Sequence, residues 1–388
     1  MPAADYTQDS RVVMTLDAGG TNFRFSAIRG GKPVIETVVL PAGSDDLKNC
    51  LRRLVEGFRR IEKVLPQPPS AISFAFPGPA DYPRGIIGDL GNLPCFRGGV
   101  ALGAMLGDEF DIPVFINNDG DLFAFGEAIG GLLPQVNGLL AKAGSVKRFS
   151  NLLGVTIGTG LGGGMVRNGE LFLGDNSMAG EIWLLRNKLS PAMNAEEGAS
   201  IRAVRRVYAE CAGVAFGEAP EPLEIYKIAL GQRPGDKPAA LEAFRRLGET
   251  VGDAMGNALT LVDGLAVIGG GLAGAASLFL PALVAELNGE FATPNGKRIR
   301  RLASQAFNLE DPDQLAAFLN GGVQEIEVPR VGPAPGNART VPYDPLPRIG
   351  VGLSRLGTSQ AVALGAYAFA LQKLDDTQPA DPGGAAID

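Results

Sequence analysis

Histidine is absent from the 388 residues of this chain. Because imidazole is the commonest general base and a frequent zinc ligand, acid–base chemistry must fall mainly to carboxylates, Lys, Tyr or Cys. Only three cysteines are present, Cys50, Cys95 and Cys211, and they lie far apart in the sequence. They predict neither a disulfide framework nor a zinc site, and they fit a reducing compartment such as the cytoplasm.

The chain also lacks a signal-peptide core and an excess of positive charge. Val12 to Leu16 is too short an apolar run for a signal peptide, which favours a cytoplasmic protein. Leu265 to Leu287 is nearly uncharged, but Gly269–Gly271 and Pro281 interrupt it, so we read strand, loop and helix there rather than a membrane span. The net charge of −7 predicts neither a nucleic-acid partner nor a membrane partner.

Glycine, by contrast, is abundant, with 54 residues, about twice its ordinary share. The first glycine-rich turn is Asp17–Arg24, DAGGTNFR, between two apolar runs that we read as strands. Gly19 and Gly20 allow close approach of the backbone to a ligand, and Thr21 and Asn22 offer a hydroxyl and an amide to phosphate oxygens. The turn is therefore either a phosphate site or an ordinary hairpin with a polar turn.

A second turn of the same design follows in the other half of the chain. Leu152–Ile157 is a predicted strand, Gly158 to Gly164 a turn with Thr159 in it, and Met165 begins another strand. Two such units suggest duplicated lobes that face one another. The spacing also satisfies G-x-G-x-x-G, but a strand follows instead of the helix that a Rossmann site needs.

A third glycine-rich turn, Gly269–Gly274, connects the predicted strand Leu265–Ile268 to a helix. Strand, G-x-G-x-x-G and helix is the local context of a dinucleotide site, and Glu286 or Glu290 lies at about the right distance to bind a ribose. An oxidoreductase therefore remains an alternative. Against it, no further strand–helix–strand unit clearly follows, and the other two turns would be unexplained.

Polar residues also follow two predicted strands at the edge where ligands of α/β proteins bind. Ala71–Phe76 ends in Pro77–Pro79, and Pro113–Ile116 ends in Asn117–Asp121. Asp119 stands there between a strand and a helix, a position suited to catalysis, although Asn-Asp-Gly is also an ordinary helix cap.

The remaining pattern predicts a coarse order of elements. From Gly289 to Gly350 the sequence is irregular, with many Pro, Gly and charged residues, and we expect a solvated insertion that includes the basic cluster 297–301. Helices are expected over Asp45–Val64, Val100–Phe110, Leu122–Ile129, Asn194–Ala209, Pro222–Leu230, Pro238–Val262 and Ser359–Leu374.

The three turns together resemble motifs of the ROK family of sugar kinases (repressor, open reading frame, kinase), within the actin, hexokinase and Hsp70 superfamily. DAGGTNFR is similar to its first phosphate motif, IGTGLGGG (157–164) to its second, and VIGGGLAG (267–274) to its adenosine motif. The resemblance implies an α/β, two-lobed actin-like ATPase fold of the ribonuclease H-like type, with duplicated lobes around a nucleotide cleft. The lobes would be 1–119, completed by a helix at about 359–375, and 120–358.

The resemblance also implies ATP and Mg²⁺ as cofactors. Asp17 would hold the Mg²⁺ through water. The residues that it assigns to the cofactor are Asp17, Gly19, Gly20, Thr21, Asn22, Arg24, Gly158, Thr159, Gly160, Gly269, Gly270 and Gly271.

For the sugar, the segments PGP (77–79), GNLP (91–94) and NND (117–119) resemble the family's sugar loops and its Asn-Asp motif. Asp119 would be the general base that accepts the proton of a hexose hydroxyl, most simply the 6-hydroxyl. The residues assigned to the sugar are Gly78, Asn92, Asn118, Asp119, Glu181 and Glu196.

Two segments depart from the family pattern. AGEIW (179–183) matches the family's Gly-Glu-Ile-Gly-His only in part, and LRNKLSPAMNAEE (185–197) replaces the usual three-cysteine zinc loop, so no structural zinc is expected. A sugar-binding protein without catalysis is therefore an alternative. A sugar-responsive repressor is another, which we disfavour because only sixteen residues precede Asp17. Family resemblance further implies a homodimer.

Overall fold

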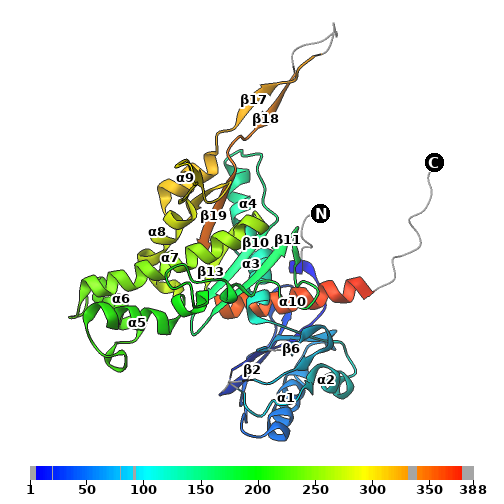
Figure 1. Cartoon of the computed structure of the whole chain (residues 1–388). Helices are drawn as coiled ribbons and strands as arrows, with labels where there is room; N and C mark the ends of the chain where they lie inside the picture. Colours follow the sequence, from blue (N-terminus) through cyan, green and yellow to red (C-terminus); the bar gives the residue numbers. More distant parts are fainter. Residues whose placement is uncertain (1–5, 20, 79, 91–92, 331–338, 378–388) are drawn as a thin grey trace.

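The computed structural model describes residues 6–19, 21–78, 80–90, 93–330 and 339–377, which form two lobes around two mixed sheets (Figure 1). The first sheet has the strand order β3-β2-β1-β5-β9, and β4 also pairs with β2. β1 is antiparallel to β2 and parallel to β5, which is parallel to β9. The bounds are β1 (Val13–Ala18), β2 (Asn22–Arg29), β3 (Lys32–Pro33), β4 (Val38–Pro41), β5 (Ala71–Ala75) and β9 (Val114–Asn117).

The second sheet, β12-β11-β10-β13-β19-β16, repeats this design. β10 is antiparallel to β11 and parallel to β13, and β13 is parallel to β19, so β11, β10, β13 and β19 correspond to β2, β1, β5 and β9. The expected duplicated, two-lobed α/β fold is confirmed. The bounds are β10 (Leu152–Ile157), β11 (Leu161–Arg167), β12 (Glu170–Leu171), β13 (Leu265–Gly269), β16 (Gln305–Asn308) and β19 (Arg348–Leu353).

The expectation that no strand–helix–strand unit follows Gly269–Gly274 is wrong, since β13 is followed by α8 (Ala276–Leu287) and by the strands β16 and β19, which run parallel to it in the same sheet. β13 lies between β10 and β19 in a sheet that copies the first one, and a short 3-10 turn (Ala273–Ala275) precedes α8. The third turn nevertheless belongs to a sheet with the strand order of the first one, so it does not by itself indicate a Rossmann domain.

Alternating side chains place the two faces of each sheet in different cores. In β1, Met14 and Leu16 face α1 and α2, whereas Val13 faces the central helices. α1 begins after its N-cap Asp46, whose carboxylate accepts a hydrogen bond from the Asn49 N–H at 2.7 Å. The helices that cover the outer faces are α1 (Leu47–Glu62), α2 (Leu102–Phe110), α5 (Ile201–Ala212), α6 (Pro222–Ala229), α7 (Lys237–Val262) and α8 (Ala276–Leu287).

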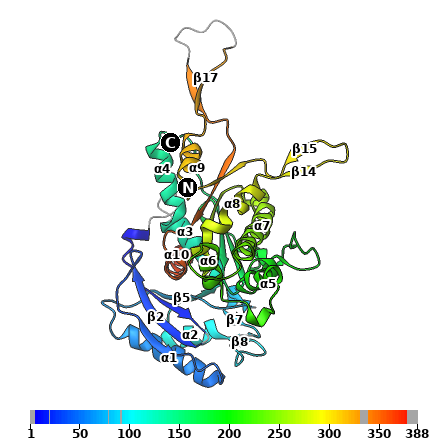
Figure 2. The ribbon, with the colours of Figure 1, turned by 90° about the vertical axis from the view of Figure 1, so that its left-hand side faces the viewer.

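Two helices, α3 (Asp119–Gly130) and α10 (Thr358–Thr377), lie side by side between the sheets (Figure 2). α10 contacts β1, β5 and β9, and α3 contacts β10 and β11. Gly126 and Gly365 allow the close approach, because a Cβ at either position would collide with the backbone of the other helix. The assignment of residues to lobes at 119/120 and at 359–375 stays a prediction.

The expectation of a solvated insertion over 289–350 is wrong in part. β16 and β19 belong to the second sheet, and Phe307 and Ile349 are buried. Two antiparallel pairs do project from the body: β14 (Glu290–Ala292) with β15 (Arg298–Arg300), and β17 (Gln324–Glu327) with β18 (Thr340–Tyr343), as Figures 1 and 2 show. In the sequence, α9 (Pro312–Asn320) lies between the two pairs.

Smaller differences concern helix limits and one helix that has no counterpart in the sequence prediction. The helix expected from Asn194 begins only at Ile201, after a 3-10 turn, and α4 (Leu132–Lys142) was not predicted. A three-stranded sheet is formed by β6 (Ala80–Asp81), β7 (Ile86–Ile87) and β8 (Val100–Ala101).

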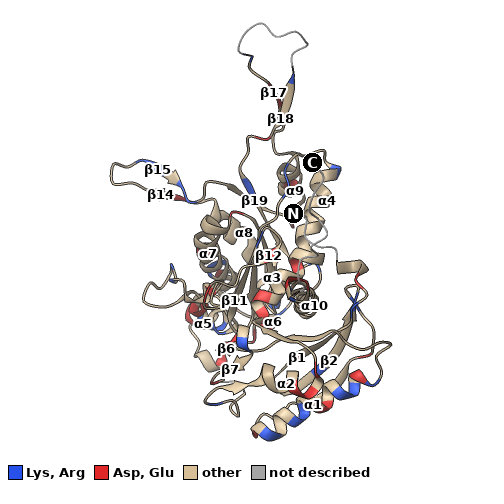
Figure 3. Ribbon diagram, turned by 90° about the vertical axis from the view of Figure 1, so that its right-hand side faces the viewer, with Lys and Arg blue, Asp and Glu red and all other residues tan. Residues whose placement is uncertain are grey.

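Residues of both charge signs lie close together along α1, as Figure 3 shows. There Arg53 and Arg60 both pair with Glu56, and Arg59 pairs with Glu62. None of the helices in the described part of the chain combines the length and the apolar character needed to cross a bilayer.

Candidate active site

Two cavities meet where α3 and α10 begin. The smaller, of about 430 Å³, is lined by the second glycine-rich turn together with Glu181, Trp183 and Glu196. The larger, of about 1020 Å³, is lined by Asp17 and other residues of the first sheet. Asn118, Asp119, Thr358 and Val362 line both cavities. The N-terminal end of α3 therefore lies at their junction.

Asp119 is held there by the start of its helix. β9 ends at Asn117, and Asn118 is the N-cap of α3, since its Oδ1 accepts a hydrogen bond from the Gly120 N–H at 2.7 Å. The same N–H lies 2.9 Å from Oδ1 of Asp119. The cap and the catalytic interpretation of this segment are thus compatible, because Asn118 supplies the cap and Asp119 faces the cavities.

The environment of Asp119 makes its carboxylate more basic than that of an ordinary aspartate. The residue keeps solvent-exposed surface in the cavities, yet protein atoms crowd it, and this desolvation raises the pKa of its carboxyl above the ordinary range. The hydrogen bond from the Gly120 N–H opposes that pKa shift without cancelling it. A carboxylate with a raised pKa is the better proton acceptor, so the site suits general-base chemistry.

A second acid, Asp121, lies behind Asp119 and was not predicted as a site residue. Only 2% of its surface is exposed, and its Oδ1 has no hydrogen-bond partner among the described residues. Burial raises the pKa of Asp121 well above its usual value, and the charges of Glu181 and Asp119 add to the effect. Its only sequence signal was its place two residues after Asp119.

Tyr82, which was not predicted either, completes this polar group. Its buried hydroxyl donates a hydrogen bond to the Phe76 carbonyl at 3.0 Å, and it also hydrogen bonds with Asn118. Burial raises the pKa of the phenol, and the nearby carboxylates raise it further. Tyr82 thereby connects the end of β5 to the cap of α3.

The second glycine-rich turn is tied to α5. The Gly158 N–H donates to the Gly160 carbonyl at 2.9 Å, and the Gly158 carbonyl accepts from the Ile201 N–H at 2.8 Å. Glu196 supports the same turn, because its Oε2 accepts from the Leu161 N–H at 3.1 Å while Arg202 pairs with Oε1 at 2.9 Å. A direct contact of Glu196 with a sugar stays a prediction.

Glu181 and Trp183 form one wall of the smaller cavity. The indole Nε1 of Trp183 donates a hydrogen bond to Oε2 of Glu181. Trp183 is the single tryptophan of the chain. The sequence marked it only as a departure from the family pattern.

The third turn joins the second turn to α10. Gly270 has φ +89°, and a Cβ there would collide with the backbone of Ile157, so this position requires glycine. The Leu272 N–H donates to the Ile157 carbonyl at 3.0 Å, and the Gly270 N–H donates to Oγ1 of Thr358 at 2.9 Å. Thr358 was missed because its role depends on the position of α10.

The first turn contributes less to the cavities than expected. Asp17, at the end of β1, and its cross-strand neighbour Arg24 line the larger cavity, as does Gly78. The Gly19 N–H donates to the Asn22 carbonyl at 3.1 Å and closes the turn. Among the described residues predicted to bind the cofactor, Gly19, Thr21, Asn22, Gly269 and Gly271 do not line either cavity, whereas Gly158, Thr159, Gly160 and Gly270 line the smaller one.

Two predicted site residues, Gly20 and Asn92, lie outside the described residues. Within the ranges that are described, no group of three or more His, Cys, Asp and Glu side chains is arranged to hold a metal ion.

The model of the ROK family matches residues 13–304. The chain belongs to the ROK family. It is 54% identical to a glucokinase from Parabacteroides distasonis ATCC 8503, whose crystal structure it matches with a TM-score of 0.85 over 95% of this chain and 99% of that one. The expected family is thus confirmed.

More distant ROK proteins share the fold or part of the sequence. A ROK hexokinase from Thermus thermophilus is 21% identical, with a TM-score of 0.64 over 94% of this chain and 99% of its own. An N-acetyl-D-glucosamine kinase from Vibrio vulnificus strain YJ016 is 26% identical over 274 residues, which are 66% of this chain and 82% of that protein.

Proposed function

We propose that this ROK protein is an ATP-dependent glucokinase that transfers the terminal phosphate of ATP to the 6-hydroxyl of glucose. The observation that carries the proposal is the position of Asp119, a carboxylate with a raised pKa at the junction of two cavities. The 54% identity to a glucokinase over nearly the whole chain supports glucose as the sugar.

Each substrate would contact residues of both lobes. The phosphates of ATP would lie against the turn Gly158–Gly160 and the turn that begins at Asp17, and its adenosine near Gly269–Gly271. The sugar would bind Asn118, Asp119, Glu181 and Glu196, with Gly78 and Asn92 beside it. Oδ1 of Asn118 accepts from the Gly120 N–H, and an N–H of the same amide group would donate to a sugar hydroxyl.

In the reaction, Asp119 accepts the proton of the 6-hydroxyl as that oxygen attacks the terminal phosphorus of ATP. The new bond joins the sugar oxygen to phosphorus, and the bond from phosphorus to the bridging oxygen breaks, so ADP leaves with the electron pair. General-base assistance of this kind contributes about 10²- to 10⁴-fold in rate. The lobes position the two substrates and exclude water from the transfer.

Mg²⁺ fits the residues at the larger cavity. The exposed carboxylate of Asp17 lines it, and Mg²⁺ prefers a carboxylate, phosphate oxygens and water as ligands. Asp17 would hold the ion through water. When bound, the ion neutralises charge on the ATP phosphates.

A coupled assay of ADP release tests the proposal with glucose, mannose, fructose, N-acetylglucosamine and N-acetylmannosamine as substrates. We expect the highest kcat/KM with glucose. A higher value with an N-acetylated sugar would contradict the choice of sugar, and glucose binding without ADP release would favour a non-catalytic sugar-binding protein.

We also propose that the enzyme is a homodimer, as family resemblance implies, and that it acts in the cytoplasm, a reducing compartment that fits its three widely spaced cysteines. Sedimentation velocity of the purified protein measures the first of these, and a single monomeric species at micromolar concentration would contradict it.

A further inference from the structure

The segment between Glu181 and Glu196 leaves the smaller cavity and returns to it. The Ala195 N–H donates to the Leu185 carbonyl at 2.6 Å, and residues 186 and 194 form an isolated β-bridge. Residues 186–194, here called the 186–194 loop, are therefore closed at their base. One end leads directly to Trp183 and Glu181, and the other end leads to Glu196.

The beginning of this loop is buried where Gly198 approaches α7. Asn187 is 3% exposed, and its Oδ1 accepts hydrogen bonds from the N–H groups of Leu189 at 2.9 Å and Ser190 at 3.2 Å. A Cβ at Gly198 would lie 2.5 Å from Nδ2 of Asn187 and 2.8 Å from Cγ2 of Thr250 in α7. This turn orients the side chain of Lys188 toward α7 and α8.

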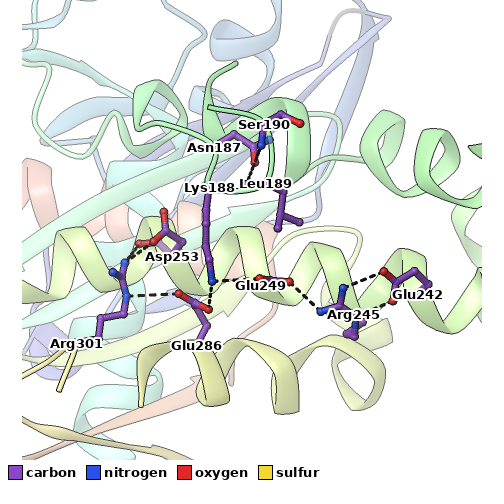
Figure 4. Close-up of polar contacts among 10 residues, drawn as sticks. All are labelled: Asn187, Lys188, Leu189, Ser190, Glu242, Arg245, Glu249, Asp253, Glu286 and Arg301. Carbon is purple, nitrogen blue, oxygen red and sulfur yellow. Dashed lines mark hydrogen bonds and ion pairs between the residues drawn. The ribbon is translucent and has the colours of Figure 1, made fainter. Parts of the chain in front are cut away.

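Lys188 then bridges two helices (Figure 4). Its ammonium lies 3.1 Å from Oε1 of Glu249 in α7 and 2.6 Å from Oε2 of Glu286 in α8. Burial alone would lower the pKa of Lys188, but the hydrogen bonds to these glutamates raise it, so the lysine stays charged. The loop is thus joined to both helices by a charged side chain.

The two glutamates belong to a wider network. Arg245 pairs with Glu249 at 2.8 Å, while Arg301 pairs with Asp253 at 2.8 Å and lies 3.9 Å from Glu286. The side chains of Glu249 and Glu286 are 20% and 15% exposed. Isolated surface pairs contribute little, but removing a cation that two partly buried carboxylates share weakens the charge balance of both.

We propose that Lys188 is a positioning residue, whose double ion pair holds the 186–194 loop and thereby fixes Glu181, Trp183 and Glu196 at the smaller cavity. The effect of Lys188 on catalysis rests on the proposed function, whereas its effect on the position of Trp183 is independent of that function. The observations that support the proposal are the closed loop, its buried beginning near α7 and the pairs to two different helices.

The single tryptophan makes this proposal measurable without catalysis, because the emission of Trp183 reports only on this wall of the cavity. Lys188→Met removes the ammonium and keeps an unbranched stem. Lys188→Arg keeps a cation that can reach both glutamates. Arg245→Met is the matched control, since Arg245 pairs with the same Glu249 but has no contact with the loop among its ion pairs.

We expect Lys188→Met to shift the Trp183 emission to longer wavelength and to increase its quenching by acrylamide. The KM for glucose should rise about tenfold while kcat changes less than about threefold, because the pocket is displaced and the base is not. Lys188→Arg and Arg245→Met should stay close to the wild type in all four measurements.

Three results would overturn the proposal. The first is a Lys188→Met variant with wild-type Trp183 emission, quenching and KM that loses only thermal stability. The second is an Arg245→Met variant in which the emission and quenching of Trp183 change as much as in Lys188→Met. If Lys188→Met does not fold, Glu286→Gln replaces it, and an unchanged Trp183 in that variant contradicts the proposal. If the wild type neither phosphorylates nor binds glucose, the proposed function fails, and the emission and quenching of Trp183 still decide the role of Lys188.

Discussion

Replacement of Asp119 by Asn separates its chemistry from its structural role. In Asp119→Asn, Oδ1 can still accept the hydrogen bond from the Gly120 N–H, which is 2.9 Å long in the wild type. The cap of α3 is untouched, because Asn118 accepts from that same N–H at 2.7 Å. The variant therefore keeps the first turn of the helix and loses only a carboxylate that can accept a proton.

The expected loss of activity follows from the size of general-base assistance. We expect kcat with glucose to fall by about 10²- to 10⁴-fold, which corresponds to about 2.7–5.4 kcal/mol in the activation free energy. The KM for glucose should change little, since the neutral amide can still hydrogen bond to the 6-hydroxyl.

The thermal stability of Asp119→Asn, unlike its activity, should not fall. Burial raises the pKa of Asp119 in the folded state, so its contribution to folding is fully present below the unfolded-state pKa and is lost as the pH rises through the folded-state pKa. The neutral amide is not subject to that loss. At neutral pH, Asp119→Asn should therefore unfold at the same temperature as the wild type or at a higher one.

The assay is steady-state ADP release with glucose, alongside differential scanning calorimetry of the same preparations. Asp121→Asn is the matched control, because it is the same substitution two residues further along α3, at a side chain that lines neither cavity. A kcat of Asp119→Asn within about tenfold of the wild type would refute the assignment of the base. Equal losses in the two variants would attribute the effect to the charge of this region instead.

The remaining predictions concern stability. Asp121→Asn should unfold at a higher temperature than the wild type at neutral pH, because the raised pKa of Asp121 makes folding of the wild type less favourable as the pH rises. The difference in unfolding temperature should shrink toward about pH 4. Calorimetry from pH 4 to 8 measures this difference, and a value that does not change with pH would contradict the prediction. Glu127→Ala should reduce the free energy of unfolding by about 3–5 kcal/mol in urea titrations, because this fully buried carboxylate accepts hydrogen bonds from Leu132, Ser354 and the loop before α10. A loss below about 1 kcal/mol would show that water replaces the carboxylate as the acceptor of those hydrogen bonds. Gly126→Ala should reduce the free energy of unfolding by about 1–3 kcal/mol, because the added methyl group forces α3 and α10 apart. Gly138→Ala is the control: its methyl group meets no atom, so the variant should be as stable as the wild type or more stable by up to about 1 kcal/mol. Equal effects of the two variants on the unfolding temperature would argue against the close helix contact.

Strand pairing explains most of the elements that the sequence did not reveal. β16 and β19 have only 4 and 6 residues, and they lie in a stretch rich in Pro, Gly and charge, so neither has a clear local pattern. Their partners are each other and the distant β13. Arg301 was grouped with a solvated basic cluster, but its side chain is 6% exposed, and α7 and α8 bring Asp253 and Glu286 to it.

The glycine-rich turns, the duplicated strand–turn–strand units and the carboxylate after β9 were all visible in the sequence, because each depends on residues that are adjacent along the chain. The meeting of Asp119 with Asp121, Tyr82, Thr358 and Trp183 was not, because those contacts require α3, α10 and both sheets to be in place. Motifs that are contiguous in the sequence thus indicated the family by resemblance, and that resemblance led to Asp119 as the proposed base. Tertiary packing decided the pKa of that base, the residues that surround it and the ion pairs that hold the 186–194 loop.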